Sequence, residues 1–161
     1  MGRSIAENVT LPHLELVSRH GRVSRRAERA YADDLIRRID VRTPHAAVPV
    51  NALSGGNQQK VLFAKWLLHP PRVLLADEPT RGVDVGAKRA IYELIQSLAA
   101  EGMAVLLISS ELEEVLGLAH RVLVMRGGEI VKRLDGDEIT ENAVISASFA
   151  MELALAGGRT G

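Results

Sequence analysis

Hydrophobic residues recur at helical intervals in the first part of the chain. Residues 22–39 carry apolar side chains four residues apart, through Tyr31 and Leu35, with most of the arginines on the opposite face, which predicts an amphipathic helix. A second helix is expected to begin near Ser54 and to be stopped by Pro70. The first 70 residues are therefore predicted to be mainly helical.

Beyond residue 71 the pattern alternates between short apolar runs and helical periods. Residues 73–76 and 104–108 are apolar at every position, which is typical of strands buried on both faces of a parallel sheet, and residues 85–100 between them have a helical period. This order predicts a βαβ crossover unit, with Gly102 ending its helix. The same rules predict the remaining elements: a helix at residues 111–118, a hairpin of strands at 122–125 and 130–134, a helix at 141–155, and a frayed end at 157–161.

Together these elements predict an α/β fold in three parts. A helical subdomain (residues 1–70) precedes the carboxyl-terminal half of a core that has a mostly parallel sheet with flanking helices (71–136), and a helix with a frayed tail follows (137–161). With 47% apolar residues in a chain of 161, there is enough material for a packed core.

The charge balance and the lack of certain segments exclude several classes of partner. Twenty basic and twenty acidic residues cancel, so no net field draws the protein to nucleic acid, and the arginines of residues 22–29 are interpreted as a solvated helix face. The sequence has no cysteine, no signal-peptide pattern at its start, and no apolar run near the roughly 20 residues that span a bilayer. The expected location is therefore cytoplasmic, with any membrane association peripheral.

A Ser-Gly-Gly turn at the start of the second predicted helix is a candidate anion site. Residues 53–60 read LSGGNQQK, and free backbone N–H groups at the positive end of a helix bind anions. The alternative is that Ser54 is a plain N-cap, but a cap does not need both Gly55 and Gly56, and two missing side chains let an anion approach the backbone. Lys60 is expected to face solvent and is given no catalytic role.

Two adjacent carboxylates follow the first predicted strand. Asp77 and Glu78 come directly after residues 73–76, at the carboxyl end of a strand, where open α/β sheets bind ligands. Asp77 is predicted to anchor Mg²⁺, and Glu78 to orient or deprotonate an attacking water. The alternative is a polar turn that closes the strand, since acidic residues before a proline such as Pro79 are common turn formers. Together the two motifs indicate phosphate chemistry on a nucleotide.

The order and spacing of these motifs resemble those of ATP-binding cassette (ABC) proteins. Residues 53–60 are similar to the variant signature of ribose, xylose and galactose importers, and residues 77–88 (DEPTRGVDVGAK) are similar to their Walker B motif and D-loop. Residues 108–116 (ISSELEEVL) fit the second cassette of those proteins. The resemblance runs from about residue 4 to about residue 134. It implies the carboxyl-terminal part of a P-loop NTPase fold whose ATP hydrolysis is coupled to carbohydrate uptake.

The resemblance also implies partners and a site shared between two cassettes. Cassettes of this family pair head to tail, so that the signature of one binds the γ-phosphate of ATP held by the other. The residues that would act in this way, in trans, are Ser54, Gly55, Gly56 and Asn57. The implied partners are a second cassette, membrane-spanning permease subunits and, indirectly, a periplasmic or extracellular sugar-binding protein, with no nucleic acid.

The remaining motif residues receive roles by the same resemblance. Asp77 corresponds to the Walker B acid that binds Mg²⁺, Glu78 to the catalytic base and Asp84 to the D-loop acid that couples the two sites. Ser110 takes the place of the switch histidine of most cassettes, although a serine lacks the charge and the reach of an imidazole.

One expected motif does not occur in the printed sequence. No Gly-x-x-x-x-Gly-Lys-Ser/Thr loop is present, and the family's adenine-stacking aromatic, Walker A loop and Q-loop glutamine are all expected upstream of Met1. The chain alone is therefore predicted to hydrolyse no ATP. Two functions remain open: the carboxyl-terminal portion of a sugar-importer ATPase, or a non-catalytic fragment or interaction module that lends only its signature surface to another cassette.

Overall fold

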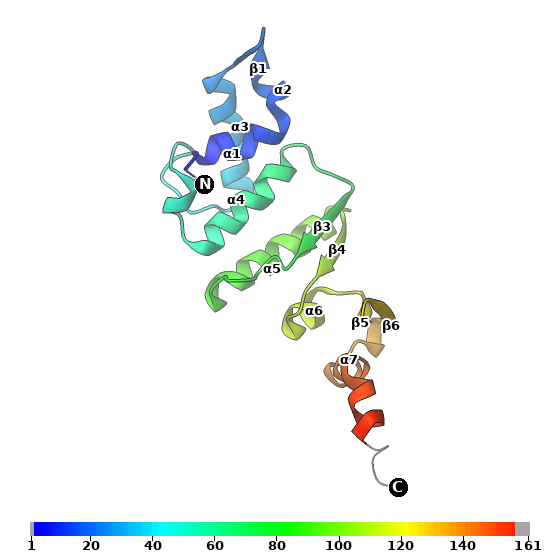
Figure 1. Ribbon diagram of the computed structural model, residues 1–161. Helices are drawn as coiled ribbons and strands as arrows, with labels where there is room; N and C mark the ends of the chain where they lie inside the picture. The colour runs from blue at the N-terminus through cyan, green and yellow to red at the C-terminus, as the bar shows by residue number, and fades with distance from the viewer. Residues whose placement is uncertain (1, 157–161) are drawn as a thin grey trace. The chain divides into compact units, whose positions relative to one another are not determined.

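The computed structural model describes residues 2–156, with side chains as far as residue 149 (Figure 1). The chain divides into two compact units, Met1–Leu106 and Leu107–Gly161. The frayed end predicted for residues 157–161 lies outside the described residues. The division of the sequence into three functional parts stays a prediction. Among the described helices, none is both long enough and apolar enough to cross a bilayer.

The first unit, as far as residue 70, is mainly helical. It contains short helices, a small β-hairpin and two longer helices. In chain order the elements are α1 (Ile5–Thr10), η1 (Leu11–His13), α2 (Leu14–Val17), β1 (Ser18–Arg19), β2 (Arg22–Val23), α3 (Arg25–Arg38), η2 (Val50–Ala52) and α4 (Gly55–Leu67). The Ser24 hydroxyl accepts a hydrogen bond from the Ala27 N–H (3.3 Å) and so caps α3. The two predicted helices are confirmed as α3 and α4, whereas the hairpin β1–β2 was not predicted.

The buried face of α3 agrees with the predicted face at Leu35 but is shifted by one residue in the first half of the helix, where Ala32 is buried instead of Tyr31. Glu28 and Leu35 are buried, whereas Tyr31 is 39% exposed. Glu28 can occupy a core position because its carboxylate accepts hydrogen bonds from Thr10 Oγ1 (3.2 Å) and Arg25 Nη1 (2.9 Å). The prediction that Tyr31 faces the core is therefore wrong, because apolar spacing alone does not reveal a buried carboxylate that has partners.

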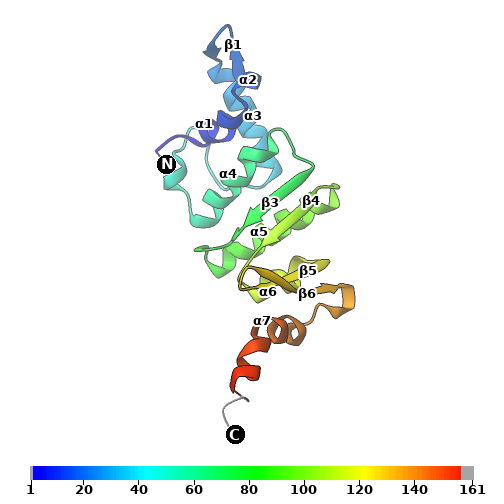
Figure 2. The same cartoon turned by 45° about the vertical axis from the view of Figure 1, so that its right-hand side comes forward.

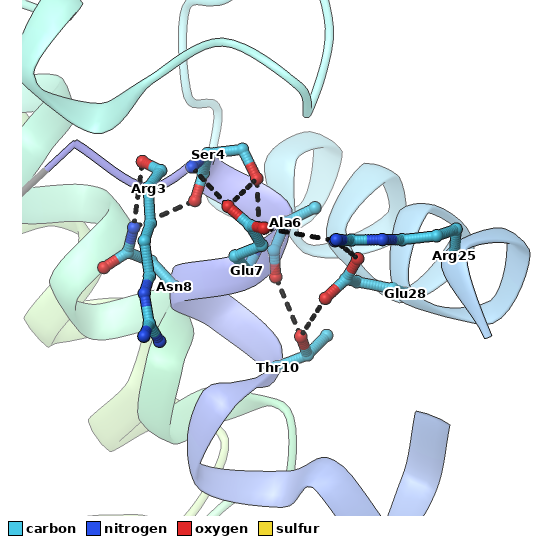
Figure 3. Close-up of polar contacts among 8 residues, drawn as sticks. All are labelled: Arg3, Ser4, Ala6, Glu7, Asn8, Thr10, Arg25 and Glu28. Carbon is cyan, nitrogen blue, oxygen red and sulfur yellow. Dashed lines mark hydrogen bonds and ion pairs between the residues drawn. The ribbon is translucent and has the colours of Figure 1, made fainter. Parts of the chain in front are cut away.

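A polar network joins α1 to α3 (Figure 3). Arg25 Nη1 donates to Glu7 Oε1 (3.1 Å) as well as to Glu28, and Glu7 Oε2 accepts from the backbone N–H of Ser4 (2.9 Å). The Ser4 N–H first, and the Arg25 guanidinium next, lower the pKa of Glu7. Ser4 Oγ accepts in turn from the Glu7 N–H, which completes a capping box at the start of α1. The network therefore fixes the beginning of α1 against α3.

The predicted crossover unit is present. It consists of strand β3 (Val73–Asp77), helix α5 (Val85–Ala100) and strand β4 (Ala104–Ile108). β3 pairs with β4, and the Ala104 N–H at the start of β4 donates to the carbonyl of Arg72, just before β3 (3.0 Å). The two strands therefore start together and run parallel, as both views show (Figures 1 and 2). Gly102, at φ +94°, takes the left-handed conformation expected where the helix ends.

Only one face of this strand pair is buried. In β3, Leu74 and Ala76 are buried, whereas Val73 and Leu75 are 55% and 69% exposed. In β4, Leu106 is 51% exposed. The prediction that these strands are covered on both faces is wrong for the described part of the chain, because no element there covers the side chains opposite α5.

The second unit contains α6 (Leu112–Leu118), β5 (Arg121–Arg126), β6 (Glu129–Asp135), η3 (Gly136–Glu138) and α7 (Glu141–Ala156). β5 and β6 pair antiparallel across Gly127 and Gly128, both of which have positive φ, as expected for a tight hairpin. Val122, Val124 and Leu134 of the hairpin form the core, with side chains of α6 and α7 packed against it. The predicted helix, hairpin and final helix are confirmed.

Asp135 makes the second unit sensitive to acid. Arg133 Nε (2.7 Å) and Arg121 Nε (2.6 Å) donate to its carboxylate, and these two guanidinium groups, Arg133 first, lower the pKa of Asp135 from 3.8 to about 2. Because the pKa is lower in the folded state than in the unfolded state, the stabilisation is complete above about pH 4 and is lost as the pH falls toward about 2.

We therefore expect the urea midpoint of the chain to fall between about pH 4 and about pH 2, and to fall less in the variant Asp135→Asn. Asp137→Asn, which alters a neighbouring exposed carboxylate, serves as the control and should follow the parent chain. An equal acid sensitivity of Asp135→Asn and the parent would show that the two arginines do not stabilise the fold through Asp135.

Candidate functional site

The Ser-Gly-Gly turn forms the N-terminus of α4. Ser54 is the N-cap residue in an extended conformation (φ −62°, ψ 156°), and the Gln58 N–H donates to its carbonyl (2.9 Å). The Ser54 hydroxyl makes no capping hydrogen bond to the helix backbone, so the alternative role of Ser54 as a side-chain cap is not realised. Ser54 and Gly55 are exposed, and the first N–H groups of a helix have no intrahelical acceptor. The turn therefore presents donors at an accessible, electropositive helix end.

The side chain of Asn57 connects this turn to the loop that follows α3. Its Oδ1 accepts from the backbone N–H of Arg42 (2.8 Å), and its Nδ2 donates to Ser54 Oγ (2.9 Å). One turn further along α4, Lys60 Nζ donates to the Asp40 carbonyl (2.8 Å) and lies 3.6 Å from Asp40 Oδ2. These partners could not be predicted from the sequence, because they lie 15 and 20 residues away along the chain.

Lys60 does not face solvent as predicted. Its residue is only 8% exposed, and its ammonium group is held by the two oxygen atoms of Asp40. Asp40 has a φ of +51°, the left-handed conformation in which a chain leaves a helix, and it directly follows the C-cap residue of α3. The prediction was wrong because a lysine at a helix–loop junction can be buried when a carbonyl and a carboxylate replace its hydration. Lys60 therefore stabilises the attachment of α4 to the end of α3.

Gly55 and Gly56 differ in their surroundings. A Cβ atom placed on Gly55 would meet no atom within 4 Å, so the space there is open to a ligand. A Cβ atom placed on Gly56 would lie 2.5 Å from Ala87 Cβ, in the first turn of α5. Gly56 is therefore required for the close packing of α4 on α5, a reason that the sequence did not reveal.

This close packing brings the signature turn next to the candidate D-loop residue. Asp84 is the N-cap of α5, and its Oδ1 accepts from the Ala87 N–H (3.0 Å). The same Ala87 contacts Gly56, so a single residue lies between the two predicted site segments. The Asp84 carboxylate fixes the start of α5 in this conformation of the chain.

Asp77 and Glu78 lie at the carboxyl end of β3, as predicted. Asp77 is the last residue of the strand and is exposed, and Glu78 begins the turn that follows. The carbonyls of Glu78 and Thr80 accept from the N–H groups of Arg81 (3.1 Å) and Val83 (3.0 Å), which forms two successive turns leading into α5. Glu78 has a φ of +45°, a conformation that costs about 1–3 kcal/mol for a residue other than glycine and that recurs at functional sites.

The donor set suits a magnesium ion held with a nucleotide better than an ion held by protein alone. The described side chains contain no group of three or more histidine, cysteine or acidic residues placed to enclose a metal. Asp77 and Glu78 offer two carboxylates, and Mg²⁺ is commonly bound by one or two carboxylates together with water and substrate phosphates.

Ser110 lies in the second unit, between β4 and α6. It is exposed at a bend, and the neighbouring Ser109 Oγ accepts from the Glu111 N–H (3.0 Å). His120, directly before β5, is also exposed.

Comparison with known protein families identifies a match over the first half of the chain. The family model described as ABC transporter matches residues 2–81. A putative ribose/galactose/methyl galactoside import ATP-binding protein of Pseudomonas fluorescens is 50% identical over 148 residues, which are 92% of this chain and 29% of that protein. The ribose import ATP-binding protein of Escherichia coli O157:H7 is 47% identical over 141 residues, 88% of this chain and 28% of that protein. The chain thus spans less than a third of the length of these relatives.

Solved structures with the same fold are nucleotide-binding cassettes. A dimeric ATP-binding cassette in a post-hydrolysis state with ADP and Pi is 25% identical, with a TM-score of 0.66 over 83% of this chain and 56% of that one. The ADP conformation of another cassette has a TM-score of 0.73 over 98% of this chain and 64% of that one, at 20% identity, which shows the fold alone.

Proposed function

This chain belongs to the ATP-binding cassette (ABC) transporter family, and we propose on that premise that it forms part of the ATP-binding subunit of a sugar importer. The observation that carries the proposal is the identity of 47–50% with ribose and galactose import ATP-binding proteins over about nine-tenths of the chain. Alignments of 141 and 148 residues in a chain of 161 include both the signature turn and the Asp77–Glu78 pair. The ATPase function belongs to the whole subunit.

The signature turn would act on ATP that another cassette holds. Ser54 Oγ and the backbone N–H groups of Gly55 and Gly56 would bind the γ-phosphate in trans, because they are donors at a helix N-terminus whose first two residues, Ser54 and Gly55, are exposed. The dimeric cassette bound to ADP and Pi supports a paired arrangement, since this chain shares its fold. Asp84, which caps α5 beside this turn, would link the turn to the site on the other side of the dimer.

Asp77 and Glu78 would act on the ATP that is bound by the cassette to which this chain belongs, not on the ATP of the partner cassette. Asp77, exposed at the end of β3, would hold Mg²⁺ through water, and the bound ion would neutralise charge on the phosphates. Glu78 would accept a proton from the attacking water, or orient it, from a backbone held in the left-handed conformation. Ser110 would take the place of the residue that contacts the γ-phosphate in most cassettes, and its hydroxyl can donate a hydrogen bond but carries no charge.

The wider assembly follows from the same proposal. The subunit would lie at the cytoplasmic face of the membrane, bound to permease subunits that span the bilayer, and would act indirectly with a sugar-binding protein outside. No nucleic acid is involved. A second candidate is a non-catalytic module that lends only its signature surface, with Ser54 and Gly55 exposed, to another cassette.

A chimeric protein tests the proposal directly. In the ribose import relative of Escherichia coli O157:H7, the 141 aligned residues are replaced by those of this chain, and ATP turnover is measured with Mg²⁺. We expect turnover in the chimera, and at least about a tenfold loss in Gly55→Asp, because the added carboxylate would repel the γ-phosphate while the space around Gly55 leaves the fold undisturbed.

Control proteins define what each result means. The 161-residue chain by itself is expected to show no turnover. A chimera that hydrolyses ATP equally well with Gly55→Asp would remove the anion-binding role from the turn. A folded chimera that hydrolyses none would favour the non-catalytic module.

A further inference from the structure

We infer that Asn57 is a positioning residue, whose side-chain amide holds the Ser54 hydroxyl so that its hydrogen is donated to the phosphate. This inference rests on the proposed function, because the phosphate is the one that the signature turn is proposed to bind. It assigns Asn57 a role that acts through Ser54, in place of direct contact with the nucleotide.

Both polar atoms of the Asn57 side chain are already engaged within the chain. The backbone N–H of Arg42 can only donate, so the Asn57 atom 2.8 Å from it is the amide oxygen. The other atom is then the amide nitrogen, which lies 2.9 Å from Ser54 Oγ. The identity of the two amide atoms is thus fixed by the hydrogen-bond partners themselves. An amide held in this way has little freedom to turn toward a ligand.

The direction of the second hydrogen bond determines what Ser54 can do. An amide NH₂ only donates, so Ser54 Oγ is the acceptor of the bond from Asn57. The hydroxyl hydrogen of Ser54 is therefore not used in that bond. Ser54 Oγ also accepts no capping bond from the α4 backbone. On an exposed residue at a helix N-terminus, the hydroxyl hydrogen is left available to an anion, beside the Gly55 and Gly56 N–H groups.

The support for Asn57 extends into the loop after α3. Arg42 N–H holds Asn57, and two residues earlier Asp40 holds Lys60 through its carbonyl (2.8 Å) and carboxylate (3.6 Å). Asn57 and Lys60 lie three residues apart and therefore on one side of α4. The loop is thus attached at two points to the first two turns of the helix, which restricts the motion of Asn57 and, through it, of Ser54.

A double-mutant cycle in the chimeric importer ATPase tests this inference. Ser54→Ala is expected to lower kcat about 100-fold, as for the loss of one donor to a transition-state oxygen. Asn57→Ala is expected to lower it about tenfold, as for the loss of one orienting hydrogen bond. In the Ser54→Ala background, Asn57→Ala is expected to have no further effect on kcat, because the hydroxyl that it orients is absent.

Lys60→Met is the matched control for a purely structural contribution. It removes the other attachment of the same loop while leaving the Asn57–Ser54 hydrogen bond in place, so it is expected to lower the thermal midpoint of the chimera without a tenfold loss of kcat. Asn57→Ala is expected to fold, because alanine is the most favourable residue in a helix.

The outcomes separate this inference from the proposed function. A non-additive cycle supports the role of Asn57 through Ser54. Additive losses, or full activity of Asn57→Ala in a chimera that needs Ser54, would overturn the inference and leave the proposed function intact. A chimera whose turnover is indifferent to both Ser54→Ala and Gly55→Asp would overturn the proposed function, and the inference with it.

Discussion

Replacing Glu78 by glutamine in the chimeric ATPase is expected to lower kcat at least about 100-fold, because a glutamine amide cannot accept the proton that a general base removes from water. The change is nearly isosteric. Glu78 has a φ of +45°, and a glutamine would experience the same backbone strain, so the substitution alters the chemistry of the side chain without relieving the turn. ATP affinity is expected to change much less than kcat, because nothing is removed from the groups that bind the phosphates.

The measurement is ATP turnover with saturating Mg²⁺, together with nucleotide binding at equilibrium. Glu93→Gln is a suitable control, since Glu93 lies on α5, is exposed, and forms a surface ion pair with Arg89. Equal loss of kcat in both variants, or a Glu78→Gln chimera with undiminished turnover, would show that Glu78 is not the base. A parallel variant, Glu78→Asn, would test the strain itself, because asparagine tolerates the left-handed conformation better than glutamate.

The elements predicted best from the sequence are those with a regular pattern of apolar positions and with glycines at their ends. Helix α5 and strand β4 were predicted at their observed bounds, since the helix has a regular apolar face and Gly102, at φ +94°, provides a clear stop. The hairpin β5–β6 was equally clear, because two glycines separate two short apolar runs. In these elements local preference and tertiary packing agree.

The sequence predicts poorly where a charged residue is buried. Glu28 and Lys60 occupy buried positions because distant groups satisfy them: Thr10 and Arg25 for the first, Asp40 for the second. A pattern of polar and apolar positions places charged residues outside, and it holds no information on a partner 18 or 20 residues away. This is why the face of the first half of α3 was predicted one residue out and why Lys60 was expected in solvent.

The same distinction holds for the candidate site. The residues at the end of β3 and at the start of α4 can be found from motif and position, since strand ends and helix ends are where ligands bind. The relation between those segments depends on contacts that only the fold provides, such as Gly56 against Ala87 and Asn57 against Arg42. From sequence, the two glycines of the signature turn have the same purpose. In the structure, the space beside Gly55 is open to a ligand, whereas the space beside Gly56 is occupied by Ala87 of α5.

That difference predicts opposite effects of two alanine substitutions at adjacent positions. A Cβ on Gly56 would lie 2.5 Å from Ala87 Cβ, closer than two carbon atoms can approach, so Gly56→Ala forces α4 and α5 apart. Overpacking of this kind costs about 1–3 kcal/mol, and a loss of about 2 kcal/mol lowers the thermal midpoint of a chain of 161 residues by about 4–8 °C. A Cβ on Gly55 meets nothing within 4 Å, so Gly55→Ala should leave the midpoint unchanged or raise it slightly.

Thermal unfolding of the 161-residue chain, followed by circular dichroism, measures both substitutions. Adding Ala87→Gly to Gly56→Ala removes the contacting methyl group and should recover part of the lost stability, although a glycine inside α5 itself costs about 1 kcal/mol. If Gly56→Ala melts at the same temperature as Gly55→Ala, α4 does not pack on α5 at this point. The proximity of the signature turn to Asp84 would then lose its support, since Ala87 is the residue that both of them contact.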